Sequence, residues 1–103
     1  MTQSEHEAGK REDAVQLPAE LTIAQSGEFY QKFEELIEEG SDIILDGAAV
    51  TRIDTAFIQL LYQVQRTLVD SSHRLQWVNP GKAIIRSVEL LGMSEQLALT
   101  EAR

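Results

Sequence analysis

The sequence contains no cysteine, and this absence removes two classes of protein at once. A chain without thiols forms neither a disulfide framework nor a zinc site built on thiolates. The chain also lacks long apolar runs: the longest are far too short to cross a membrane, and no charged-then-apolar signal peptide opens it. We therefore expect a cytoplasmic protein without direct membrane insertion.

Basic side chains are also scarce, with 9 Lys and Arg against 17 Asp and Glu and a formal net charge of −8. Nucleic-acid binding requires a basic footprint, so the composition argues against a nucleic-acid partner. An acidic surface instead favours solubility and partner proteins with basic surfaces. At 103 residues, the chain is long enough for one domain with its own core.

Residues 1–13 are polar and charged, lack periodicity and contain almost no large apolar side chain. Such a segment buries too little surface to offset the entropy of ordering, so we predict a disordered polar tail followed by a single domain over residues 14–103. His6 lies in the tail and His73 in a turn, and their spacing to acidic residues fits no zinc site. We expect neither a metal nor a cofactor.

Alternating residues at positions 14–18 predict a short strand that the proline ends. A helix then begins near Thr22, whose spacing to Gln25 fits a capping box, with Ser26 as the alternative start. Its inner face is apolar, and Gly40 ends it. The outer face is acidic and is either a solvated surface or a docking surface for a basic partner; it consists of Glu28, Glu34, Glu35, Glu38 and Glu39.

The rest of the chain alternates strands with helices. In order, the pattern predicts a strand over residues 41–45, a helix from Thr55 to about Asp70, a strand over residues 74–78, a helix that ends at Gly92, and a last short helix capped by Ser94. Alternation of this kind implies right-handed crossovers and parallel pairing. We therefore predict an α/β fold in which about four helices cover a small, mixed but mostly parallel β-sheet.

The helix after Thr55 has an unusually wide apolar face, because its polar stripe is narrow. One interpretation is that this helix packs between the sheet and a neighbouring helix. The other is a partly exposed apolar patch for a partner, with Phe57 as its exposed member. The same face makes a weak homodimer conceivable.

The sequence offers no converging acid, base and nucleophile, so we expect a protein that is not an enzyme. Asp46 at a strand end and Lys82 after a later strand resemble the phosphorylation site of receiver domains. That site needs an acidic pair at the end of the first strand to hold a metal, and here only Glu20 is present. Asp46 is expected instead to accept backbone hydrogen bonds in its loop.

The run from Leu45-Asp46-Gly47 through Ile53-Asp54-Thr55-Ala56 to Gln59-Leu60-Leu61 combines a buried strand, a polar loop and the start of a helix. Asp and Thr side chains both cap helix N-termini, so Asp54 or Thr55 can serve in that role alone. This run resembles the central signature of STAS domains, the family of bacterial anti-sigma-factor antagonists. Weaker similarity extends from about Val15 to about Leu99, and Phe57 stands where the family usually has glycine.

The resemblance implies a small sheet with one antiparallel edge and a signalling protein that contacts a kinase, an anti-sigma factor or a chemotaxis-type protein. It also implies that Thr55 is the residue a partner kinase phosphorylates. A phosphate there would meet free N–H groups and the positive end of the helix dipole. The partner-binding residues expected at this corner are Arg52, Asp54, Thr55, Ala56, Phe57 and Gln59.

A second role stays open for the same corner. Some STAS domains that resemble this chain are regulatory subunits of ABC-type lipid transporters, and there the corner would be a permanent contact with the ATPase subunit, without phosphorylation. The bulky Phe57 next to the Thr55 hydroxyl would either obstruct a kinase active site or serve as the anchor that a partner buries. Aromatic side chains carry much of the energy of interfaces.

Overall fold

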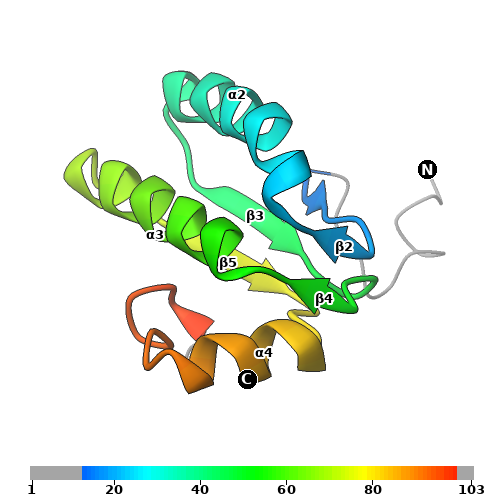
Figure 1. The fold of residues 1–103 in the computed structure, drawn as a ribbon. Coiled ribbons are helices and arrows are strands. Elements are labelled where there is room, and N and C mark those ends of the chain that lie inside the picture. Colours follow the sequence, from blue (N-terminus) through cyan, green and yellow to red (C-terminus); the bar gives the residue numbers. More distant parts are fainter. Residues whose placement is uncertain (1–12, 100–103) are drawn as a thin grey trace, which may run out of the picture.

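The computed structural model of the chain describes residues 13–99 (Figure 1). The predicted tail lies outside this part except for Asp13, so its disorder and the domain boundary stay predictions. The described elements follow in the order β1 (Val15–Gln16), β2 (Glu20–Leu21), α2 (Ile23–Glu39), β3 (Ile43–Asp46), β4 (Arg52–Ile53), α3 (Thr55–Asp70), β5 (Leu75–Val78) and α4 (Lys82–Leu90).

Strand β3 is the centre of the main sheet, with β1 on one side and β5 on the other. Both neighbours run parallel to it, in a register that places Leu45 opposite Val15 and Trp77. The short strands β2 and β4 form a second parallel pair. The predicted α/β class with mostly parallel strands is therefore confirmed, while the antiparallel edge implied by the resemblance is not found among residues 13–99, where every strand pair is parallel.

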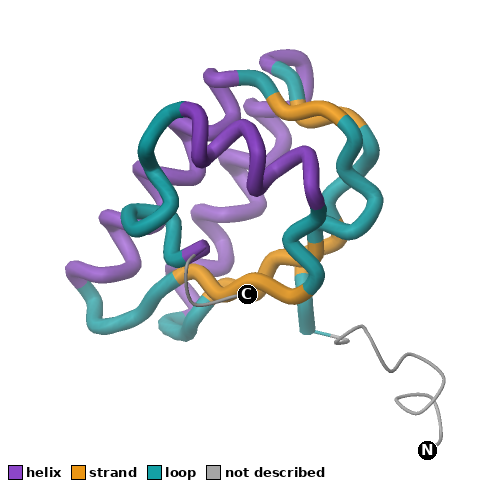
Figure 2. Tube along the Cα trace, turned by 90° about the horizontal axis from the view of Figure 1, so that it is seen from below, coloured by secondary structure: helices purple, strands orange, loops and turns teal. Residues whose placement is uncertain are grey.

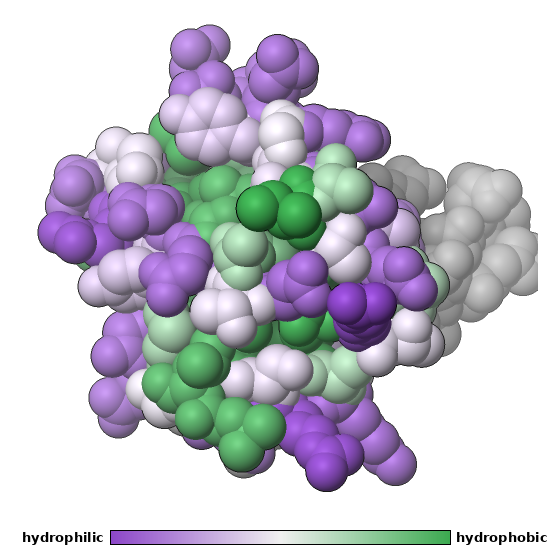
Figure 3. Space-filling model, viewed as in Figure 1, coloured by the Kyte–Doolittle hydropathy of each residue, from purple (hydrophilic) through white to green (hydrophobic). Residues whose placement is uncertain are grey.

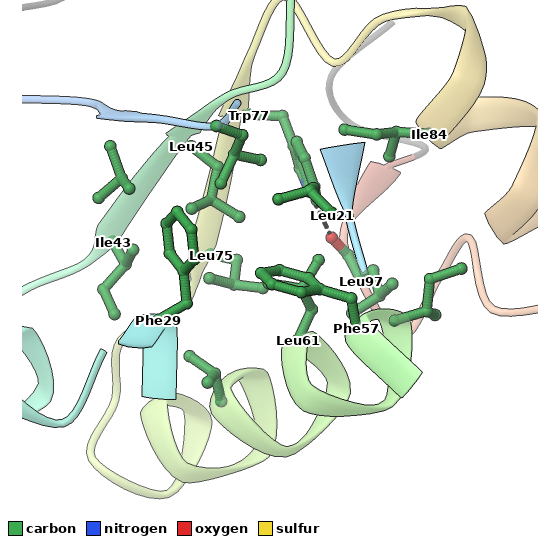
Figure 4. Close-up of a cluster of buried hydrophobic side chains, with 14 of the residues drawn as sticks. Leu21, Phe29, Ile43, Leu45, Phe57, Leu61, Leu75, Trp77, Ile84 and Leu97 are labelled. Atoms are coloured by element: carbon green, nitrogen blue, oxygen red, sulfur yellow. Dashed lines mark hydrogen bonds between the residues drawn. The ribbon is translucent and has the colours of Figure 1, made fainter. Parts of the chain in front are cut away.

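Helices α2 and α3 lie side by side over the sheet, and α4 lies on the opposite side (Figure 1). Seen from below, α4 and the segment after it are in front of the other two helices (Figure 2). The core fills the space between α3 and the strands, where Leu45, Leu61 and Leu75 are completely buried (Figure 4). Burial on this scale is the main force that holds the layers together.

Helix α2 begins at the position that the capping-box spacing predicts. The hydroxyl oxygen of Thr22 accepts the N–H of Ala24 at 3.3 Å, and the side-chain oxygen of Gln25 accepts the N–H of Thr22 at 2.8 Å. Ser26 is therefore inside the helix. At the other end Gly40 adopts a left-handed conformation with φ of 75°, which glycine reaches without strain.

The predicted last helix from Ser94 is wrong. Residues 94–98 form turns, and the described part of the chain has three α-helices rather than about four. The segment is drawn onto the core instead: Leu97 is completely buried, and its carbonyl accepts the indole N–H of Trp77 at 2.8 Å (Figure 4). Ala98 takes a left-handed conformation with φ of 62°, which a right-handed helix does not contain.

Asp42 directly precedes β3, at the end of the sheet opposite to the loop before α3. Its carboxylate accepts the backbone N–H of Arg74 at 3.0 Å and the side-chain N–H of Gln76 at 2.6 Å. The hydrogen bond from Gln76 is the largest of the effects that hold the pKa of Asp42 below its ordinary value. These bonds tie the residue before β3 to strand β5 and so help to fix their register.

Candidate functional site: the corner before helix α3

The corner starts where β3 ends, in a turn made by backbone contacts with the loop after β5. The N–H of Gly47 donates to the carbonyl of Asn79 at 3.1 Å, and the N–H of Val50 donates back to the carbonyl of Gly47 at 3.1 Å. A Cβ atom on Gly47 would lie 2.6 Å from the carbonyl oxygen of Pro80, so only glycine allows this approach. The loop after β3 and the loop after β5 are therefore held together by close backbone contact.

Asp46 has the structural role that the sequence predicts for it. The side chain is 2% exposed, and its carboxylate accepts the backbone N–H of Ala48 at 3.0 Å and the amide of Gln16 at 3.4 Å. A carboxylate buried and occupied in this way is a poor phosphate acceptor or metal ligand. Among residues 13–99, no group of three or more His, Cys, Asp or Glu side chains is placed to hold a metal ion.

The second half of the loop is held by strand β2. Ala19 accepts the N–H of Thr51 at 2.7 Å, and Leu21 accepts the N–H of Asp54 at 2.9 Å. Between them, β4 pairs with β2 so that Ile53 lies opposite Leu21. The residue that precedes α3 is therefore fixed by main-chain hydrogen bonds to a segment more than 30 residues earlier in the chain.

Asp54 caps α3 with its backbone and not with its side chain. Its carbonyl accepts the N–H groups of Phe57 at 3.0 Å and Ile58 at 3.1 Å, whereas its carboxylate makes no cap hydrogen bond and lies 3.7 Å from Nε of Arg52. The sequence left open whether the side chain of Asp54 or of Thr55 caps the helix, and the Asp54 carboxylate does not. Within the described chain, nothing accepts a hydrogen bond from the backbone N–H groups of Thr55 and Ala56.

Thr55 is the first residue of α3, and its side chain is exposed. Ala56 and Gln59 are exposed on the same first turns, and the side chains of Arg52 and Asp54 are 64% and 34% exposed. Five of the six predicted partner-binding residues are thus accessible around the corner. Whether a partner contacts them stays a prediction.

Phe57 is the exception, and the prediction that it is exposed is wrong. The side chain is 0% exposed, and its ring packs edge-on against Phe29 of α2 with a centroid distance of 5.5 Å (Figure 4). The reason is the helical repeat: two positions after Thr55, about 100° per residue turns the side chain from the surface to the core. The Phe57 ring is therefore not accessible to a partner in this conformation, and it does not cover the Thr55 hydroxyl.

The wide apolar face of α3 mostly supports the packing interpretation. Its apolar residues reach both the sheet and α2; those that are buried are Phe57, Ile58, Leu61, Val64 and Leu68. Gln65 is buried among them, and its carbonyl oxygen accepts the N–H of Leu75 at 2.8 Å. Sequence reasoning missed this link, whose only signal is a polar residue inside an apolar run.

A groove along the outside of α2 and α3 also escaped the sequence analysis. It begins beside Ala56 and Gln59 of the corner and continues between the two helices past Tyr30 and Leu60. Periodicity finds the apolar residues of each helix but does not tell which of them are left partly uncovered when the helices meet.

No curated protein sequence matches the chain. A family model does: the model described as "Mlab, STAS domain" matches residues 5–101, nearly the whole chain. STAS domains are generally non-enzymatic regulatory modules that act through protein interactions. Among residues 13–99, no helix is both long and apolar enough to cross a membrane. By the match over almost its entire length, the chain belongs to the STAS-domain family in the group described as Mlab.

Proposed function

We propose that this protein is a signalling regulator that binds a partner through the corner before α3 and that phosphorylation of Thr55 resets the binding. The partner is a kinase, an anti-sigma factor or a chemotaxis-type signalling protein, as the resemblance to anti-sigma-factor antagonists implies. The observation that carries the proposal is the exposed hydroxyl of Thr55 at the first position of α3, beside backbone N–H groups that no protein atom in the described chain uses.

The chemistry of a phosphate at this position supports the proposal. The open N–H groups of Thr55 and Ala56 and the positive end of the helix dipole stabilise negative charge, so the modification need not unfold the helix. A phosphate adds up to about two negative charges and three acceptor oxygens. On a chain with a net charge of −8, this addition repels an acidic partner surface or recruits an arginine.

The buried position of Phe57 also favours the proposal. A ring that projected beside Thr55 would hinder a kinase active site, but here the ring lies against Phe29 in the core. The ring that stands where the family usually has glycine therefore packs between α2 and α3 and leaves the threonine accessible.

The test is a capture experiment from lysate of the source organism, with the wild-type chain, Thr55→Glu and Ser71→Glu as baits. Ser71→Glu is the matched control, because it adds the same charge at the exposed opposite end of α3. We expect mass spectrometry to find a kinase or signalling partner that wild type and Ser71→Glu retain and Thr55→Glu loses. If both variants bind every partner as wild type does, the switch is refuted.

A second candidate is a permanent subunit of an ABC-type lipid transporter that docks on the ATPase subunit. The observation that favours it is the continuity of the corner with the apolar groove at Ala56, Gln59 and Leu60, since permanent interfaces are more hydrophobic than transient ones. In the same capture experiment, an ATPase would then be held equally by wild type and Thr55→Glu. Gln59→Arg, an exposed change, should release it without affecting the fold.

A further inference from the structure

We propose that the groove between α2 and α3 binds an amphipathic helix of a partner protein, with lysine or arginine residues along the edges of that helix's apolar face. The inference rests on the proposed function in taking the partner to be a protein, and it adds the surface and the chemistry of recognition.

The groove consists of two adjoining hollows of about 410 and 390 Å³. They share Tyr30, Leu60 and Gln63 and so lie next to each other along the pair of helices, and together we call them the channel. One end lies between Ser26 and Ala56, near the corner, and the other between Glu38 and Thr67. In the space-filling view, hydrophobic atoms lie recessed between the rows of side chains from the two helices (Figure 3).

The floor of the channel is apolar and only partly covered. Phe33 and Val64 are buried at the bottom, whereas Ile37 and Leu60 remain half-buried on the walls. Tyr30 projects beside them and is 52% exposed. A ridge of apolar side chains laid into this channel would remove the remaining apolar surface from water, which is the main source of affinity in helix-in-groove recognition.

The length of the channel suits a short helix. It extends along α2 from residue 26 to residue 38, a distance of about 18 Å at 1.5 Å per residue. A partner helix of about 12 residues, or three turns, covers this distance and presents apolar side chains at positions i, i+4 and i+7. The channel is formed by two helices and offers no strand edge, so an extended peptide would find no backbone to pair with.

The charges at the rim define the partner's chemistry. Glu34 and Glu38 line the α2 side, and none of the residues that line the channel is basic. A hydrogen bond with Glu34, together with the charge of that carboxylate, raises the pKa of the Tyr30 hydroxyl above its ordinary value, so the hydroxyl stays neutral beside the glutamate. The α3 side offers uncharged Gln63 and Thr67.

These charges disfavour the other occupants. A second copy of this chain would bring its own net charge of −8 and its own acidic helix against the acidic rim. An anionic lipid headgroup meets the same repulsion. A helix whose apolar ridge is flanked by lysine or arginine instead places cations beside Glu34 and Glu38 and suffers no such penalty.

The test uses a fluorescein-labelled synthetic peptide of about 12 residues with leucine at positions i, i+4 and i+7 and lysine on both flanks, titrated with the full chain and read by fluorescence anisotropy. A second peptide carries glutamate in place of every lysine. Two double variants are compared: Glu34→Lys with Glu38→Lys, which changes the rim, and Glu35→Lys with Glu39→Lys, which makes the same change in net charge at exposed positions outside the channel. Thermal unfolding checks that both variants fold.

We expect the lysine peptide to bind wild type and to lose about tenfold in affinity with the rim variant but less than about threefold with the control variant. The glutamate peptide should bind the rim variant better than it binds wild type. Chemical-shift changes in an NMR titration should lie between α2 and α3.

Three results would overturn the proposal: no binding of the lysine peptide up to about 1 mM, equal losses in the two double variants, or a concentration-dependent dimer of the chain that the rim variant abolishes. The titration involves no modification of Thr55. A groove that fails this test therefore leaves the phosphorylation switch standing, and a Thr55→Glu variant that keeps all its partners leaves the groove standing.

Discussion

Helices α2 and α3 lie side by side and differ by one residue in length, yet they begin in opposite ways. The first turn of α2 carries a capping box. The side-chain oxygen of Gln25 accepts hydrogen bonds from the backbone N–H and the hydroxyl of Thr22, and the Thr22 side chain caps the helix. The corresponding N-cap residue of α3, Asp54, makes no side-chain cap, and the residue three positions on, Phe57, is completely buried.

The difference shows two ways to fix the start of a helix. A capping box satisfies orphan N–H groups locally and leaves little for a ligand to bind. The start of α3 is held in place by the packing of the Phe57 ring in the core and by the pairing of β4 with β2. The fold therefore does not need hydrogen bonds to the exposed N–H groups of the first turn. The backbone N–H groups of Thr55 and Ala56 are therefore open at the position where the proposed modification would occur.

Removal of the buried anchor should have the largest effect. Phe57→Ala deletes a fully buried ring and its contact with Phe29, so we expect the free energy of unfolding to fall by about 3–5 kcal/mol in urea denaturation followed by circular dichroism. Gln59→Ala on the exposed side of the same helix should stay within about 0.5 kcal/mol of wild type. A loss below about 1 kcal/mol for Phe57→Ala would contradict the buried position.

The two N-caps should respond unequally to the same truncation. Thr22→Ala removes the capping box of α2 and should lower the free energy of unfolding by about 1 kcal/mol. Asp54→Ala removes a side chain that caps nothing and should change it by less than about 0.5 kcal/mol. Thermal unfolding of the two variants in parallel measures both effects, and equal losses would mean that Asp54 caps α3 in solution.

Charge at the open helix start should be mildly stabilising. Thr55→Glu places a carboxylate at the first position of α3, so we expect the free energy of unfolding to rise by up to about 1 kcal/mol at low ionic strength. The gain should shrink as salt screens the charge. Denaturant titrations at two salt concentrations measure it, and a fall of more than about 1 kcal/mol would show that the corner does not tolerate negative charge.

The smallest effect is expected at the exposed ion pair. Arg52 and Asp54 are 3.7 Å apart on a surface where both side chains contact solvent, so Arg52→Ala should change the free energy of unfolding by less than about 0.5 kcal/mol. The same variant measures whether Arg52 holds the carboxylate away from the helix. A gain in stability that Asp54→Ala then removes would indicate that Asp54 caps α3 once Arg52 is gone.

The elements with a strong periodic or capping signal were predictable. The start of α2 at Thr22, its end at Gly40 and the whole of α3 agree with the sequence expectation. The strands β2 and β4 were not foreseen, because two residues are too few for a period of two to appear. Each exists only through its pairing with the other.

The candidate site, too, was predictable from the sequence only in part. The sequence located the corner and placed Thr55 at the start of a helix, because the signature consists of residues close together in the chain. It misjudged Phe57, left the capping role of the Asp54 carboxylate open and missed the groove, because all three depend on how α2 packs against α3 and on how the loop pairs with β2.

The sequence by itself thus determined the α/β class, the order of the main elements and the position of the exposed threonine at a helix start. These follow from hydrophobic periodicity and short-range hydrogen bonding, which act between residues near each other in the chain. Only the tertiary structure decided which side chains around that threonine face solvent, because burial depends on contacts between segments distant in sequence, such as Phe29 with Phe57 and Leu21 with Asp54.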